Sequence, residues 1–244
     1  NQTKPPFALS AGEANPQRAT ARWPNLTRQT TFKRRWQAAF CSNSLMRTAG
    51  ARRIFNVSTG VCPGLWFVMR IVNLNPDSNI GASAWFVEMD GHRLLMDAGT
   101  HPKKEGRESL PLYDLFKRES LDAIAITHCL HDHVGSLPVA LRYFPKAHVL
   151  MTELSYFLVE RVLHNSVNVM KRQREELGIK EYPLYTHDEL DEIAHLFQGY
   201  KYNREIVWAA LQKTQAGFPS PTMEFYDAGH ALGSAGIMVR GHKQ

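Results

Sequence analysis

Residues 123–135 read AIAITHCLHDHVG and join a short apolar run to a cluster of histidines. The first four residues are small or β-branched and apolar, a run typical of a strand covered on both faces. Three histidines and one aspartate then follow within six residues. Imidazole and carboxylate groups bind first-row metal ions, and a loop that leaves a buried strand can aim several of them at one point. The stretch therefore predicts a metal-binding loop at the end of a strand.

Two further segments repeat this pattern of an apolar run followed by a polar residue. Residues 225–235, FYDAGHALGSA, place His230 among glycines, which let a backbone approach a bound ion closely. Residues 94–99, LLMDAG, contain Asp97, which by itself is explained equally well as the cap of a turn before Gly99. Because open α/β sheets place their sites where strand ends converge on one edge, we expect the three segments to meet.

Together the three segments resemble the metallo-β-lactamase superfamily, whose signature is His-x-His-x-Asp-His after a strand. The sequences HDHVGSLP at 131–138 and DAGHALGS at 227–234 resemble its nuclease branch, the β-CASP or cleavage-and-polyadenylation-factor-like group. The resemblance covers about residues 69–240. It implies an α/β fold, an αββα sandwich of which this chain supplies about the first half. It also implies a hydrolase that holds two Zn²⁺ ions in each complete site.

The resemblance also assigns roles to individual residues. The metal ligands that it implies are His128, Asp132, His133 and His230. Asp132 would in addition orient the nucleophilic water, and Asp97 would hold a ligand histidine from behind. One position departs from the signature, because Leu130 stands where its second histidine belongs, and leucine cannot coordinate a metal. The neighbouring His131 occupies a slot whose side chain is expected to leave the loop in another direction.

Three functions stay open on these residues. The first is a metal-dependent phosphodiesterase of RNA processing, similar to endo- and exoribonucleases, with RNA or another phosphodiester as its substrate. The second is a thioester or lactam hydrolase of the same superfamily, against which the long interval between His133 and His230 argues. The third is a non-catalytic fragment or degenerate relative, which the leucine at position 130 supports.

The basic character of the chain is confined to its N-terminal part. Residues 1–68 carry ten Lys or Arg and one acidic residue, which more than accounts for the net charge of +6. No sustained strand or helix pattern appears before about Ile54, so we expect a disordered basic arm at 1–68 and a domain at 69–244. An organelle transit peptide, a nucleic-acid-binding tail and upstream sequence that is not natively translated all explain such an arm.

The cysteines and the hydropathy pattern bear on the compartment. Cys41, Cys62 and Cys129 are scattered and lack metal-ligand spacing, so no disulfide framework is expected and a reducing, cytoplasmic compartment is predicted. The longest apolar stretch, residues 61–69, contains a proline and a glycine and is too short to span a membrane.

Local signals predict the elements that carry these motifs. An Asp-Gly pair at 90–91 predicts a hairpin of strands 84–89 and 92–96, and further strands are expected at 121–126, 147–151 and 223–226. Thr152 is expected to cap one helix, and Thr186 with Glu189 forms a capping-box pattern for another. The histidines that show no partner pattern, and are expected to be ordinary surface or core residues, are His101, His148, His187 and His195.

Overall fold

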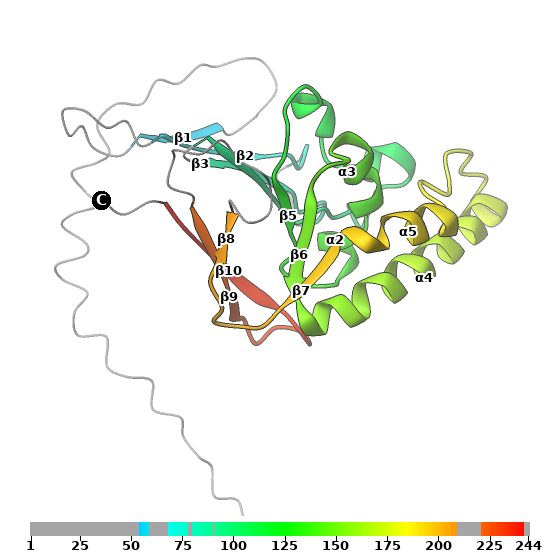
Figure 1. Cartoon of the computed structure of the whole chain (residues 1–244). Coiled ribbons are helices and arrows are strands. Elements are labelled where there is room, and N and C mark those ends of the chain that lie inside the picture. The colour runs from blue at the N-terminus through cyan, green and yellow to red at the C-terminus, as the bar shows by residue number, and fades with distance from the viewer. Residues whose placement is uncertain (1–53, 59–67, 78–79, 90, 209–220, 242–244) are drawn as a thin grey trace, which may run out of the picture. The chain divides into compact units, whose positions relative to one another are not determined.

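The computed structural model describes residues 54–58, 68–77, 80–89, 91–208 and 221–241, all within the compact unit Ser44–Gln244 (Figure 1). Its larger sheet follows the order of the sequence and contains β1 (Ile54–Ser58), β2 (Val68–Asn73), β3 (Trp85–Met89), β4 (His92–Met96), β5 (Ala123–Ala125), β6 (His148–Thr152) and β7 (Phe197–Tyr200). The smaller sheet has the order β10-β9-β8 and contains β8 (Ile206–Val207), β9 (Thr222–Asp227) and β10 (Ala235–Arg240).

Strand pairing in the larger sheet changes from antiparallel to parallel at β4. Strands β1 to β4 pair antiparallel, whereas β4, β5, β6 and β7 pair parallel. The predicted hairpin is confirmed, because Met89 of β3 pairs with His92 of β4 across a turn in which Gly91 has a φ of 78°. The parallel half brings the C-terminal ends of β4 and β5 to the same edge, since Met96 pairs with Ala125.

The helices are α2 (His131–Val134), α3 (Leu137–Tyr143), α4 (Glu153–Leu177) and α5 (His187–Ile193), with 3₁₀ turns at Gly106–Ser109, Tyr113–Phe116 and Ala194–Leu196. The two predicted caps are confirmed. The Thr152 hydroxyl accepts from the Ser155 amide at the start of α4, and Thr186 and Glu189 form a capping box on α5. Helix α4 ends at Gly178, whose φ of 69° is the left-handed conformation that glycine adopts without a steric cost.

Alternating side chains of the larger sheet supply two separate hydrophobic cores. Phe86 and Leu95 pack with residues of α3 and α4, whereas Val87 and Leu94 pack with Met223 and other residues of the smaller sheet. Figure 1 shows the corresponding layers, with α3, α4 and α5 on one side of the larger sheet and β8 to β10 on the other. This helix–sheet–sheet order matches the expected α/β sandwich in the part of the chain that the structure describes.

Part of the predicted arm lies inside this fold. Strand β1 falls within residues 1–68 and pairs with β2, so residue 68 is not where the sheet begins. Residues 1–53 and 59–67, the rest of the expected arm, lie outside the described residues. None of the described helices combines the length and the apolarity that are needed to cross a bilayer.

Candidate metal centre

The histidine-rich loop begins where β5 ends. All three residues of β5 are buried, and the chain then turns through residues 126–130 into the short helix α2. The turn places His128 directly after the strand and His133 on the helix, with their ring centroids 4.1 Å apart. The loop therefore presents two imidazoles at one point, as the sequence predicted.

Backbone contacts fix this loop against the segment that precedes β3 and the segment that follows β4. The Ala98 amide donates to the His133 carbonyl over 2.8 Å, and the Ser83 amide donates to the Asp132 carbonyl over 2.9 Å. A Cβ atom added to Gly99 would lie 1.7 Å from the carbonyl oxygen of Asp132. The close approach of the two segments thus requires a residue without a side chain at position 99.

The carboxylate of Asp97 accepts hydrogen bonds from several groups of the loop. Asp97 is buried and has a φ of 63°, a left-handed conformation that aspartate tolerates better than most residues. Its Oδ1 accepts from the Thr127 amide over 2.8 Å, and its Oδ2 lies 2.7 Å from Nδ1 of His133. An ionised carboxylate only accepts, so His133 carries its proton on Nδ1 and presents an unprotonated Nε2 when neutral.

The charges near His133 also determine its affinity for protons. Burial by itself lowers the pKa of His133, but the hydrogen bond to Asp97 and the charges of Asp97 and Asp132 outweigh burial and raise it. Nε2 of His133 lies 3.6 Å from Oδ2 of Asp132. The electrostatic environment of this nitrogen therefore favours a positive charge, which a proton or a metal ion supplies.

His128 presents a buried nitrogen that none of the described residues contacts by a hydrogen bond. The hydroxyl of Thr127 has one proton, which it donates to Asp97 over 2.9 Å, so the 2.9 Å contact with Nδ1 of His128 requires the imidazole to donate. Nε2 of His128 then carries a lone pair, and it is buried with no hydrogen-bond partner among the described residues. Burial and the neighbouring His133 lower the pKa of His128, which keeps the ring neutral. A buried, neutral, unpartnered imidazole nitrogen fits a metal ligand.

His230 reaches the same place from the other sheet. It lies in the turn between β9 and β10, where its backbone amide donates to the Ser234 hydroxyl over 3.0 Å. The Gly233 carbonyl accepts from Thr152 and Ser155 at the start of α4, over 2.7 and 3.0 Å. The exposed ring of His230 lies perpendicular to His128, with the ring centroids 5.1 Å apart.

The structure thus places the predicted ligand residues near one another, but their ligand atoms do not form a compact group. Within the described part of the chain, no three of His128, Asp132, His133 and His230 have ligand atoms that all lie within 4.8 Å of one another. The buried Nε2 of His128 and the tautomer of His133 nevertheless suit a metal ion at this point.

Leu130, which departs from the signature, and the neighbouring His131 have surroundings of their own. Leu130 is 44% exposed and precedes α2. Nδ1 of His131 lies 3.1 Å from the Thr100 hydroxyl, and its Nε2 lies 3.1 Å from the Ser166 hydroxyl. The expectation that His131 leaves the loop in another direction is confirmed, so it does not replace the missing imidazole.

A cavity beside the loop was not predicted from the sequence. It has a volume of about 620 Å³ and is lined by residues that include Asp132, His131, Lys103 and Lys104. The adjacent lysines were the one available signal, but they come from a segment without strand or helix pattern. The cavity gives Asp132 a route to solvent beside two cationic residues.

The comparisons with known proteins agree with this geometry. Residues 79–202, just over half of the chain, match the Metallo-beta-lactamase superfamily. The chain is similar to Endoribonuclease YSH1 of Candida glabrata, with 27% identity over 70% of this chain and 21% of that protein. It is also similar to Cleavage and polyadenylation specificity factor subunit 3-I of Arabidopsis thaliana, with 28% identity over 69% of this chain and 22% of the relative. The chain spans about a fifth of the length of these curated relatives.

Solved structures give a weaker likeness. A B3 metallo-beta-lactamase with an active-site glutamic acid has a TM-score of 0.40 and 11% identity, over 71% of this chain and 55% of that one. A flavo di-iron protein mutant from Thermotoga maritima has a TM-score of 0.37 and 12% identity, over 78% of this chain and 40% of that one. The sequence match over residues 79–202 decides the assignment: the chain belongs to the metallo-beta-lactamase superfamily.

Proposed function

We propose that this chain is a metal-dependent, RNA-cleaving phosphodiesterase of the superfamily. The observation that carries the proposal is the buried Nε2 of His128, which has no partner among the described residues and lies beside His133 and His230. The curated relatives are named as endoribonucleases and as a cleavage and polyadenylation factor subunit, which supports RNA as the substrate. A cytoplasmic location stays a prediction from the cysteines.

The residues have distinct roles in this proposal. His128, Asp132, His133 and His230 would hold Zn²⁺, which supplies a hydroxide at neutral pH and a Lewis acid for the phosphate oxygens. Asp97 orients His133 by accepting from its Nδ1. Asp132, whose side chain is 30% exposed and lines the cavity, can also accept a hydrogen bond from the attacking water.

A non-catalytic relative is the second candidate, and Leu130 favours it. Without an imidazole at this position, the half of the site that contains His128 and His230 lacks one of its expected ligands. Such a protein would still bind RNA or a protein partner without cleaving it.

Cleavage of a labelled single-stranded RNA separates the two candidates. We expect the chain with Zn²⁺ to cleave the RNA, and Asp132→Asn and His128→Ala to remove cleavage while the circular dichroism spectrum is unchanged. His195→Ala, at an exposed histidine outside the site, is the control and should cleave as the native chain does. Cleavage that persists in Asp132→Asn would contradict the assignment. If neither the native chain nor Leu130→His cleaves the RNA, the non-catalytic function replaces the proposed one.

A further inference from the structure

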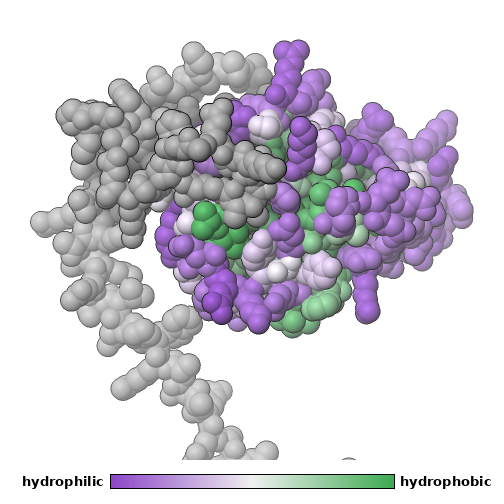
Figure 2. All heavy atoms as spheres, in the orientation of Figure 1, coloured by the Kyte–Doolittle hydropathy of each residue, from purple (hydrophilic) through white to green (hydrophobic). Residues whose placement is uncertain are grey.

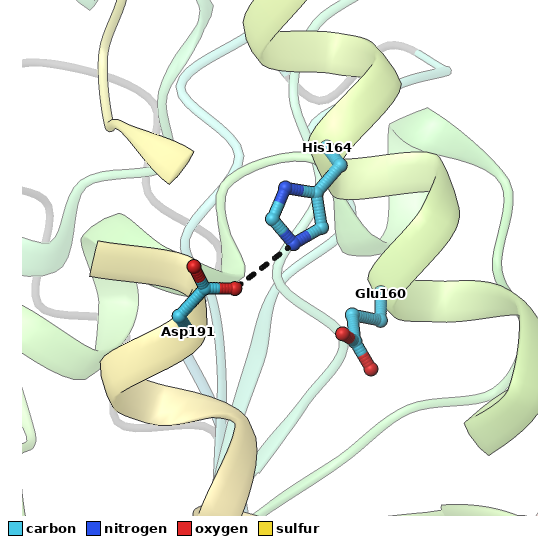
Figure 3. A group of neighbouring side chains, drawn as sticks. All are labelled: Glu160, His164 and Asp191. Atoms are coloured by element: carbon cyan, nitrogen blue, oxygen red, sulfur yellow. Dashed lines mark ion pairs between the residues drawn. The ribbon is translucent and has the colours of Figure 1, made fainter. Parts of the chain in front are cut away.

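A second group of metal-ligand side chains lies on α4 and α5, outside the centre described above (Figure 3). Glu160 and His164 are four residues apart on α4 and therefore share one face of that helix. Their ligand atoms and those of Asp191 on α5 all lie within 4.8 Å of one another. Among the described residues, no other group of three such side chains meets this distance.

His187, which shows no partner pattern in the sequence, contacts His164 in the structure. Its ring stacks on that of His164, with the centroids 5.1 Å apart and the planes 10° from parallel. The Nδ1 atoms of the two rings lie 2.8 Å apart, so one must donate to the other. Nε2 of His187 lies 3.1 Å from Oδ1 of Asn168, an oxygen that can only accept.

These contacts determine which nitrogens of His164 and His187 carry a proton when both rings are neutral. His187 donates from Nε2 to Asn168, which leaves its Nδ1 as an acceptor. His164 therefore donates from Nδ1, and its Nε2 carries a lone pair. That lone pair lies beside two carboxylates, 3.5 Å from Oδ1 of Asp191, where no hydrogen atom joins the two atoms. A cation at this position, either a metal ion or a proton on His164, would relieve the repulsion between the two acceptors.

The spacing suits a metal ion. Zn–N and Zn–O bonds of about 2.0–2.1 Å in a tetrahedral arrangement place neighbouring ligand atoms about 3.3 Å apart. The observed 3.5 Å between Nε2 of His164 and Oδ1 of Asp191 is close to this value. Ligand histidines in metal sites are commonly supported through their other nitrogen, and His187 supports His164 in this way.

We propose that Glu160, His164 and Asp191 bind a divalent first-row transition-metal ion, such as Zn²⁺, and that this ion joins α4 to α5. His187 is a positioning residue that holds the tautomer and the ring plane of His164. Glu160 and Asp191 are exposed, and the surface over these helices is predominantly hydrophilic (Figure 2), so the ion can enter from solvent. The site shares no residue with the centre on the histidine-rich loop.

Two measurements on the whole chain test the site. With ¹⁵N-labelled histidine, we expect added Zn²⁺ to shift the Nε2 resonance of His164, which is assigned by its loss in His164→Gln. Equilibrium dialysis against zinc chloride gives the second readout. Asp191→Asn keeps the shape of the side chain and should weaken one Zn²⁺ site by roughly tenfold or more. Glu192→Gln, which changes the next acidic residue on α5, should bind as the native chain does.

His128→Ala separates this site from the centre on the loop. It should leave the Zn²⁺ response of His164 unchanged, because the two sites share no ligand. Equal zinc binding by Asp191→Asn and Glu192→Gln would overturn the proposal. So would a His164 ring that responds to pH but not to Zn²⁺, since the cation in the cluster would then be a proton on His164.

Discussion

The Asp97 carboxylate lies 2.7 Å from Nδ1 of His133, and it is held there by a backbone with a φ of 63°. Asparagine also tolerates this conformation, so Asp97→Asn tests the charge without adding backbone strain. The amide has one acceptor oxygen where the carboxylate has two, so either Thr127 or His133 loses its acceptor. We expect a loss of about 1–3 kcal/mol in the free energy of unfolding. We also expect Zn²⁺ affinity to fall roughly 10–100-fold.

Urea unfolding and zinc titration check this expectation. Asp114→Asn, at an exposed aspartate that pairs loosely with Lys117, is the matched control and should change stability by less than about 0.5 kcal/mol. If Asp97→Asn binds zinc as tightly as the control, Asp97 does not support a metal ligand.

The tight contact at Gly99 gives a prediction about packing. In Gly99→Ala the new Cβ would lie 1.7 Å from the Asp132 carbonyl, so the metal loop must move away. We expect about 1–3 kcal/mol of destabilisation and weaker zinc binding, measured by thermal unfolding with and without Zn²⁺. Gly236→Ala is the control, because its Cβ would meet no atom within 4 Å. Equal stability of the two variants would contradict the observed packing of the loop.

At Leu130 we predict a substitution that raises Zn²⁺ affinity, whereas the substitutions above lower it. The side chain is 44% exposed, so replacing it with histidine removes little buried apolar surface. If the loop has the geometry of the family signature, Leu130→His supplies the missing imidazole and raises Zn²⁺ affinity by roughly tenfold or more. Leu177→His adds an imidazole at the exposed end of α4 and controls for nonspecific binding. No gain over this control would mean that position 130 does not face the ion.

The capping box of α5 predicts a pH dependence. Burial opposes ionisation of Glu189, but the Thr186 amide and Arg142 outweigh it and lower the pKa of this carboxyl. The stabilisation is therefore present above the unfolded-state pKa of about 4.3 and is lost as the pH falls through the lower folded-state pKa. Glu189→Gln should cost about 0.5–1 kcal/mol at neutral pH, a limited amount because the carboxylate is exposed to solvent.

Chemical unfolding of native chain and variant between pH 7 and pH 3 measures this dependence. The difference between Glu189→Gln and the native chain should shrink as the pH falls. Glu192→Gln lies on the same helix outside the box and serves as the control. A difference that stays constant over the whole range would mean that the ionised form of Glu189 is not what stabilises α5.

Sequence patterns predicted the elements that local chemistry determines. The hairpin at Gly91, the caps at Thr152 and Thr186, and the strand before His128 each follow from residues adjacent in the chain, and all are confirmed. The short strands β7 and β8 were not predicted, because their two to four residues give no usable period. Strand β10 was also missed, since only its pairing with β9 distinguishes it from a loop.

The features of the candidate centre that depend on contacts between distant segments were predicted only in part. The approach of His128, His133 and His230 was predicted from strand ends, but the hydrogen bond of Thr127 that determines the His128 tautomer was not. The pairing of His164 with His187 depends on how α4 packs against α5, which no local pattern reveals.

The docking of the His230 turn has a consequence for the order of folding. Its carbonyl at Gly233 is held by Thr152 and Ser155, 81 and 78 residues earlier in the chain, and the Ala235 amide is held by the Thr127 carbonyl. Closing such long loops is entropically costly, so contacts of this range form late. The three imidazoles can therefore meet only after both sheets have assembled. If the three imidazoles bind zinc as proposed, the ion would stabilise the native chain and not its folding precursors, so zinc binding would report that folding is complete.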